Sequence, residues 1–89
     1  MFKVKLIWVS LKKYQQLCHY DIQNIYATMS LSSQTSHQSV EIVFLNPQKT
    51  QAYLRFLITQ PQLSHQDTIS LFEGPHLIAH ATLSFLKEK

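Results

Sequence analysis

Apolar and polar side chains alternate with a period of two in several short segments of this 89-residue chain. This alternation constrains the fold more than any other feature, because it is the pattern of a half-buried β-strand. The clearest example is LIAHATLSF at 77–85, in which one face carries Leu77, Ala79, Ala81, Leu83 and Phe85. In QAYLRFLI at 51–58 the corresponding face carries Ala52, Leu54, Phe56 and Ile58.

Six such segments follow one another, and turn signals such as NPQK and EGPH lie between some of them. We expect strands over residues 2–9, 22–29, 40–45, 51–58, 68–73 and 77–85. Six short strands in a chain of this length favour one all-β domain over residues 1–89. The predicted architecture is a six-stranded antiparallel β-barrel, closed or nearly closed, because closure removes unpaired strand edges.

One segment, LKKYQQLCHY at 11–20, departs from the strand pattern. Leu11, Tyr14 and Leu17 are spaced by three, which is compatible with one or two helical turns. The segment is short and shows no strong capping residue, so we predict a loop with some helical character.

Composition limits the classes of function. The chain is 45% hydrophobic and only 15% charged, which excludes disorder by composition, and its formal net charge is +3. Its single cysteine, Cys18, excludes an intrachain disulfide and a site built from several thiolates. Every apolar run is too short for a membrane span or a signal peptide, so no membrane association and a cytoplasmic location are expected.

Motifs for chemistry are weak. His76 and His80 are four residues apart, but on a strand they would lie about 13 Å from each other, too far to share a zinc ion. One glycine in the whole chain cannot build a phosphate-binding loop. The acidic residues form no pair, and no nucleophile motif surrounds a serine. We therefore predict a non-enzymatic protein without a metal site, a cofactor or a bound nucleotide.

Two groups of surface residues are candidates for binding. The first is a basic patch near two tyrosines, Tyr14 and Tyr20, which could contact RNA phosphates and bases. The alternative for these lysines is a solvated set that protects a strand edge. The patch consists of Lys3, Lys5, Lys12 and Lys13.

The second group follows from strands that are apolar on both faces. A barrel this small cannot bury both faces, so part of the outer surface is predicted to meet another protein or a second copy of the chain. The residues chosen for this interface are Ile7, Val9, Phe72 and Ile78.

The order of these segments resembles the C-terminal, third β-barrel domain of elongation factor Tu over nearly the full chain. The resemblance is strongest in LRFLITQPQLSHQDTISLFEGPHLIAHATLSFL at 54–86, and YDIQNIYATM at 20–29 and VEIVFLNPQ at 40–48 also match. In that family a strand ending in proline precedes a short loop, a strand ending in Glu-Gly and a final alternating strand.

The resemblance implies the family fold and contact with tRNA, because the third domain of that factor helps hold the T-stem of aminoacyl-tRNA. Transferred position by position, the RNA-facing residues are Gln23, Ser32, Glu73 and Gly74. This chain departs from the family at Asp21-Ile22, which replace Arg-Pro, and at Pro75, which replaces the second glycine of a pair.

Two functions are therefore predicted. The first is a stand-alone module that contacts tRNA or another structured RNA. The second is a protein-interaction module that uses the exposed apolar face, with a homodimer as one form.

Overall fold

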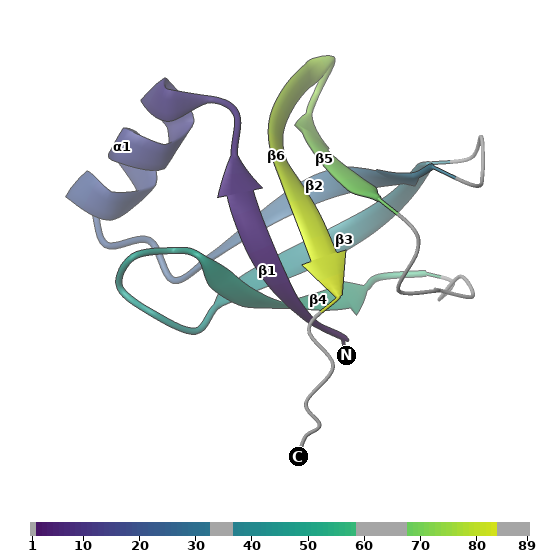
Figure 1. The fold of residues 1–89 in the computed structure, drawn as a ribbon, viewed down its shortest axis with the longest axis horizontal. Coiled ribbons are helices and arrows are strands. Elements are labelled where there is room, and N and C mark those ends of the chain that lie inside the picture. The colour runs from purple at the N-terminus through teal and green to yellow at the C-terminus, as the bar shows by residue number, and fades with distance from the viewer. Residues whose placement is uncertain (1, 33–36, 59–67, 84–89) are drawn as a thin grey trace.

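A computed structural model describes residues 2–32, 37–58 and 68–83. It contains six strands and one helix in the described residues (Figure 1). Their bounds are β1 Phe2–Trp8, α1 Leu11–His19, β2 Asn24–Leu31, β3 His37–Phe44, β4 Gln51–Phe56, β5 Ile69–Glu73 and β6 His76–Leu83.

The six strands form one closed barrel in the order β1-β4-β3-β2-β5-β6, and β6 pairs with β1 to complete it. Every neighbouring pair is antiparallel. The predicted all-β, six-stranded antiparallel barrel is thus confirmed, and of the two predicted forms, closed or nearly closed, the structure has the closed one. No strand among the described residues is left with an unpaired edge, which is how such a barrel avoids edge-to-edge association.

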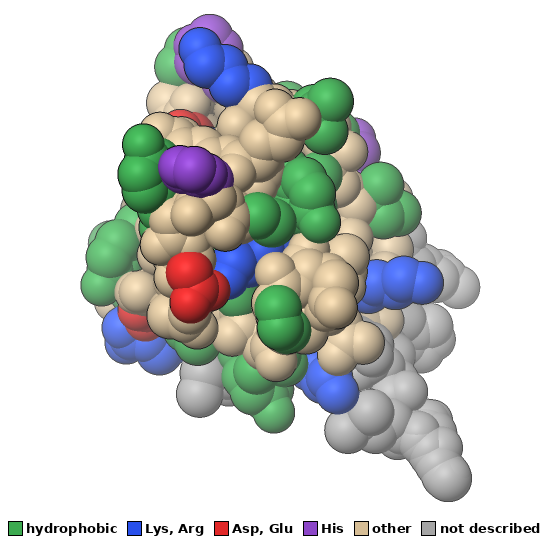
Figure 2. All heavy atoms as spheres, turned by 90° about the vertical axis from the view of Figure 1, so that its left-hand side faces the viewer, with side chains coloured by type: hydrophobic (Ala, Val, Ile, Leu, Met, Phe, Trp, Pro, Cys, Tyr) green, Lys and Arg blue, Asp and Glu red, His purple; other side chains and the backbone are tan. Residues whose placement is uncertain are grey.

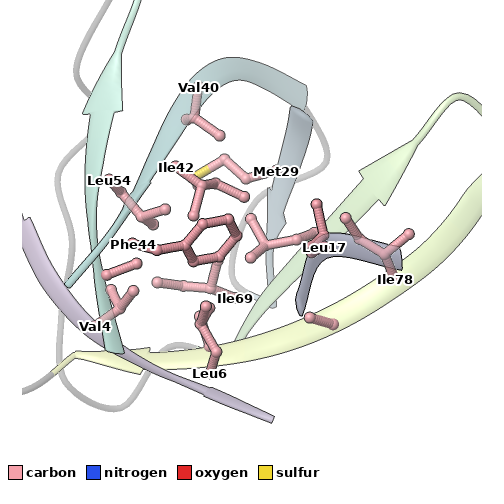
Figure 3. Packing of buried hydrophobic residues seen from close by; sticks show 14 of the residues in the cluster. Val4, Leu6, Leu17, Met29, Val40, Ile42, Phe44, Leu54, Ile69 and Ile78 are labelled. Atoms are coloured by element: carbon pink, nitrogen blue, oxygen red, sulfur yellow. The ribbon is translucent and has the colours of Figure 1, made fainter. Parts of the chain in front are cut away.

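The core lies inside the barrel and follows the period of two along each strand. Val4 and Leu6 of β1 and Ile69 and Leu71 of β5 are buried, while Lys5 between the first two is exposed. Figure 3 shows the cluster with labelled side chains pointing inward from the strands and from α1. The remaining buried members are Leu17, Met29, Leu31, Val40, Ile42, Phe44, Ala52, Leu54, Ile78, Ala79 and Ala81.

The prediction of a loop at 11–20 is wrong, because residues Leu11–His19 form helix α1. Ser10 is the N-cap, and its side-chain oxygen accepts a hydrogen bond from the Lys13 backbone N–H at 3.2 Å. This satisfies one of the backbone donors that a helix start leaves unpaired. Leu17 is completely buried in the core, so tertiary packing supplies the stability that the short helix lacks.

Ile78 was predicted on the outer face of β6, and the structure corrects this, because only 3% of its surface is exposed. The β5–β6 register shifts by one residue between Leu71, which faces Ala79, and Phe72, which faces Leu77. Ile78 has no partner in that ladder, as in a β-bulge, which redirects a side chain. Its carbonyl accepts the backbone N–H groups of Val9 and Ser10, which begin the connection to α1.

Strand ends account for two further differences. β4 ends at Phe56, so Ile58, predicted on the inner face, is 86% exposed. Phe85 lies outside the described residues.

The predicted turn at Asn46-Pro47 is present, and the Lys49 backbone N–H donates to the Asn46 carbonyl there. Lys49 lies in the left-handed region, with φ 58°. With one glycine in the chain, a lysine occupies a position that glycine usually takes.

Candidate nucleic-acid interface

The basic patch predicted as one surface is divided by the fold into two groups. Lys3 and Lys5 point outward from β1, since Val4 between them is buried. Lys12 and Lys13 belong to the first turn of α1.

The β1 group lies beside an exposed aromatic residue. Lys3 faces Tyr53 of β4 in the antiparallel register, and opposite residues point to the same side of a sheet. Arg55 is two residues further along β4 and therefore shares the face with Tyr53. Tyr53 and Arg55 are exposed. The outer surface of β1 and β4 thus combines three cations, Lys3, Lys5 and Arg55, with one tyrosine ring.

The neighbouring strands extend this surface. Glu41 of β3 faces Arg55 on one side and Tyr26 of β2 on the other. The Arg55 guanidinium lies 2.6 Å from a Glu41 carboxylate oxygen, and Asn24 donates to the other oxygen at 2.7 Å. These contacts, first that of Arg55 and then that of Asn24, lower the pKa of Glu41. The carboxylate therefore stays ionised, neutralises Arg55 and holds its head group on the face. Lys3 and Lys5 have no ion-pair partner among the described residues, so they are the cations of this face that remain for a ligand.

Tyr26 leads from this surface to the β5–β6 turn. A hollow of ≈ 330 Å³ lies between Tyr26, Leu57 and Phe72, and Glu73 and Gly74 also line it. Gly74 adopts φ 60°, a conformation that favours glycine, and an added Cβ would meet nothing within 4 Å. The backbone of this turn is therefore open to close approach by a ligand.

The α1 group lies on the other side of the same turn. The Lys13 ammonium is 2.6 Å from a Glu73 carboxylate oxygen, which joins α1 to the end of β5. Lys12, His76 and Ile78 line a second hollow of ≈ 350 Å³ around this ion pair. Glu73 neutralises Lys13. Lys12 does not share this carboxylate, so it is the cation of this group that could meet a phosphate.

The four residues transferred from the resemblance lie in three separate places. Gln23 and Ser32 flank the two ends of β2 and are about 30 Å apart at roughly 3.3 Å per residue. The Gln23 side-chain amide donates to the Asp21 carbonyl and carboxylate, and the Ser32 hydroxyl accepts the Thr68 backbone N–H. Only Glu73 and Gly74 are adjacent to each other and to a predicted lysine, Lys13.

The predicted protein-interface residues are also separated. Ile7 and Val9 are 58% and 50% exposed at the end of β1, whereas Ile78 is in the core. Phe72 is half-buried, and its ring stacks on His37 with centroids 5.9 Å apart. Leu11, at the start of α1, is 65% exposed and extends the apolar surface of Ile7 and Val9 along the chain.

The sequence reasoning missed Tyr53 and Arg55 and chose Tyr14 and Tyr20 as the aromatic neighbours of the lysines. Tyr14 is instead tied down, because its hydroxyl donates to the Gln48 carbonyl at 2.9 Å and its ring packs near Trp8. The position of Tyr53 beside Lys3 follows only from the β1–β4 pairing, which joins segments about 50 residues apart in the chain.

Within residues 2–32, 37–58 and 68–83, no three His, Cys, Asp or Glu side chains gather as ligands for a metal ion. His80 lies near Ser70 of the neighbouring strand, with Nδ1 3.4 Å from the hydroxyl oxygen. No helix in the described part of the chain is long and apolar enough to cross a membrane.

Comparison of the chain with protein-family models, with curated proteins and with solved structures finds no match.

Proposed function

We propose that this chain is a non-enzymatic domain that binds structured RNA through the outer surface of β1 and β4. The observation that carries the proposal is the pairing of the exposed Tyr53 with Lys3 across the strands, with Lys5 on the same face. Cations neutralise phosphates, and an aromatic ring stacks on an unpaired base. The combination is suited to a loop or an end of a folded RNA, where bases are accessible.

The path of the RNA is proposed to continue over Tyr26 toward Gly74, where the open backbone offers a second contact. The resemblance to the third domain of elongation factor Tu supports tRNA as the first RNA to test. The formal net charge of +3 favours binding that is moderate and sensitive to salt.

Titration of labelled tRNA by fluorescence anisotropy at increasing salt tests this proposal. Binding is expected at about 50 mM salt and weakens steeply toward about 200 mM, because phosphate contacts release counterions. Tyr53→Ala should lose about 1–3 kcal/mol of binding free energy through the lost stacking. Tyr20→Ala, which removes an exposed tyrosine elsewhere, is the matched control. No binding at low salt, or equal losses in both variants, would contradict the proposal.

The second candidate function is a protein-interaction module, and the exposure of Ile7, Val9 and Leu11 favours it. Three neighbouring apolar side chains in solvent form a surface that a partner or a second copy could cover. Sedimentation of the purified chain would then show self-association that persists at high salt, and Ile7→Ser would reduce it. A monomer at all concentrations, which also recovers no protein after nuclease treatment, argues against this function.

A further inference from the structure

Lys49 is held at one end of the barrel by a rigid turn. Its backbone N–H donates to the Asn46 carbonyl at 3.1 Å, and its own carbonyl accepts the Trp8 indole N–H at 2.6 Å. The Asn46 side-chain oxygen accepts the Thr50 N–H at 3.0 Å and fixes the turn from within. The α1 residue Tyr14 contacts the same turn, so the helix and the turn lie at the same end (Figure 1).

The Lys49 side chain is only 2% exposed, although it carries an ammonium group. Its nitrogen lies 5.3 Å from the centroid of the Phe44 ring, and the Asp21 carboxylate is 3.5 Å away. That separation exceeds the 2.7–2.9 Å of a good charge-assisted hydrogen bond. The Asp21 side chain is 78% exposed, so water screens its carboxylate and the ion pair contributes little.

An ammonium group has three N–H donors, and burial without strong acceptors is costly. Among the described residues, Asp21 provides the one side-chain hydrogen bond of Lys49. Glycine would adopt the same left-handed turn without this cost. Burial of this lysine therefore costs stability that folding alone does not require. An oxygen atom of a ligand would accept a further hydrogen bond from its ammonium group.

A hollow of ≈ 260 Å³ is lined by both members of this ion pair, Lys49 and Asp21. Leu45, Phe44 and Pro47 supply apolar walls. The side-chain amides of Gln23 and Asn46 complete the lining, and both are already hydrogen-bonded within the protein, Gln23 to Asp21 and Asn46 to Thr50. Figure 2 views the molecule from the side of α1 and shows acidic, basic and hydrophobic side chains close together on this face. The hollow thus offers one buried cation, one exposed carboxylate and an apolar surface.

We propose that this hollow binds a carboxylate ligand with an apolar body, and that its carboxylate replaces Asp21 as the counter-ion of Lys49. One cation matches one negative charge, whereas a doubly charged phosphate would leave its second negative charge unpaired beside the Asp21 carboxylate. Asp21 is exposed, and when the ligand enters its carboxylate turns toward solvent and gives up the hydrogen bond that it accepts from the Gln23 amide. Neither Tyr53 nor a β1 lysine lines this hollow, and the proposal goes beyond the proposed RNA binding.

The experiment is a titration of the ¹⁵N-labelled protein, followed by the amide signals of Asn46, Lys49 and Thr50. The probes are 4-methylpentanoate and N-acetyl-leucine, with neutral N-acetyl-leucinamide as the matched control. Both acids should shift these signals saturably at millimolar concentrations, and the amide should not. Tighter binding of N-acetyl-leucine indicates the C-terminal carboxylate of a polypeptide, and tighter binding of 4-methylpentanoate indicates a free organic acid. No shift with either acid, or an equal shift with the amide, overturns the proposal.

Two substitutions test the roles of the charges. Lys49→Met keeps an unbranched apolar side chain over Phe44 but removes the ammonium group, and it should weaken acid binding about tenfold or more. Lys12→Met, at an exposed lysine, should leave it unchanged. Asp21→Asn should tighten binding about two- to fivefold, because it removes the competing counter-ion.

A folded Lys49→Met variant with unchanged affinity, or weaker binding by Asp21→Asn, overturns the proposal. If Lys49→Met does not fold, the comparison of acid with amide in the unsubstituted protein decides alone.

Discussion

At the scale of single residues, two isoleucines of the same chain lie in opposite environments. Ile78 is 3% exposed and Ile7 is 58% exposed. We predict that Ile78→Ala lowers the free energy of unfolding by about 2–5 kcal/mol, because it removes buried methyl groups and leaves a cavity. Ile7→Ala should change it by about 0.5 kcal/mol or less. Urea denaturation of both variants measures the difference, and similar midpoints would place Ile78 outside the core.

The same two residues show where a sequence pattern is insufficient. The alternation along β6 predicts Ala79 and Ala81 inside, and both are buried. It also places Ile78 outside, and the register shift between β5 and β6 reverses this. A bulge depends on the pairing of two strands, so the period within one strand cannot reveal it. Lys49 was missed for a related reason, because its burial depends on a turn conformation that lysine rarely adopts.

Another residue-scale prediction concerns the Glu41–Arg55 pair. Arg55→Gln removes the main cause of the lowered Glu41 pKa, so this pKa should rise toward its ordinary value. A lowered pKa in the folded state gives stability that is present above the unfolded pKa and is lost as pH falls through the folded pKa. The variant should therefore lose less stability than the unsubstituted protein over the acidic range. Carboxyl chemical shifts measured against pH test this, with Lys5→Gln as the charge-matched control.

At the scale of elements, α1 is held by its N-cap, by the buried Leu17 and by the contacts of Lys13 and Tyr14 with the barrel. Ser10→Ala removes the hydrogen bond to the Lys13 N–H and should destabilise the helix by about 1 kcal/mol. Amide hydrogen exchange along α1 should accelerate, while exchange in β3 stays unchanged. Ser39→Ala, at an exposed serine of β3, is the matched control. Unchanged exchange in α1 would show that Leu17 and the contacts of Lys13 and Tyr14 hold the helix without the cap.

The strands were predictable as elements, but their pairing was not. Residues 51–56 and 69–73 alternate clearly, and both ranges are strands of the structure. The sequence signal for the helix is weak for two reasons. Ser10, a good N-cap, directly follows the strand predicted over residues 2–9, and no acidic residue occupies the first turn of the helix. The candidate interface could not be predicted without the strand pairing, since Lys3 and Tyr53 become neighbours only through the β1–β4 register. A single sequence does not carry that information.

At the scale of the whole molecule, closure makes the barrel sensitive to added volume. Ala81 of β6 is completely buried and faces Leu6 of β1 and Ile69 of β5. In an open sheet, an edge strand could move aside to admit a larger side chain. In a closed barrel, every strand has neighbours on both sides, so the extra volume must strain side chains or break a pairing.

We therefore predict that Ala81→Leu destabilises the fold by about 1–3 kcal/mol despite its greater hydrophobicity. Thr82→Leu adds a leucine at the next, exposed position and should change stability by about 0.5 kcal/mol or less. Guanidinium denaturation followed by far-ultraviolet circular dichroism measures both variants. Equal stability of the two would mean that the strands separate easily enough to admit a leucine, and that the β1–β6 and β5–β6 pairings do not hold the circumference fixed.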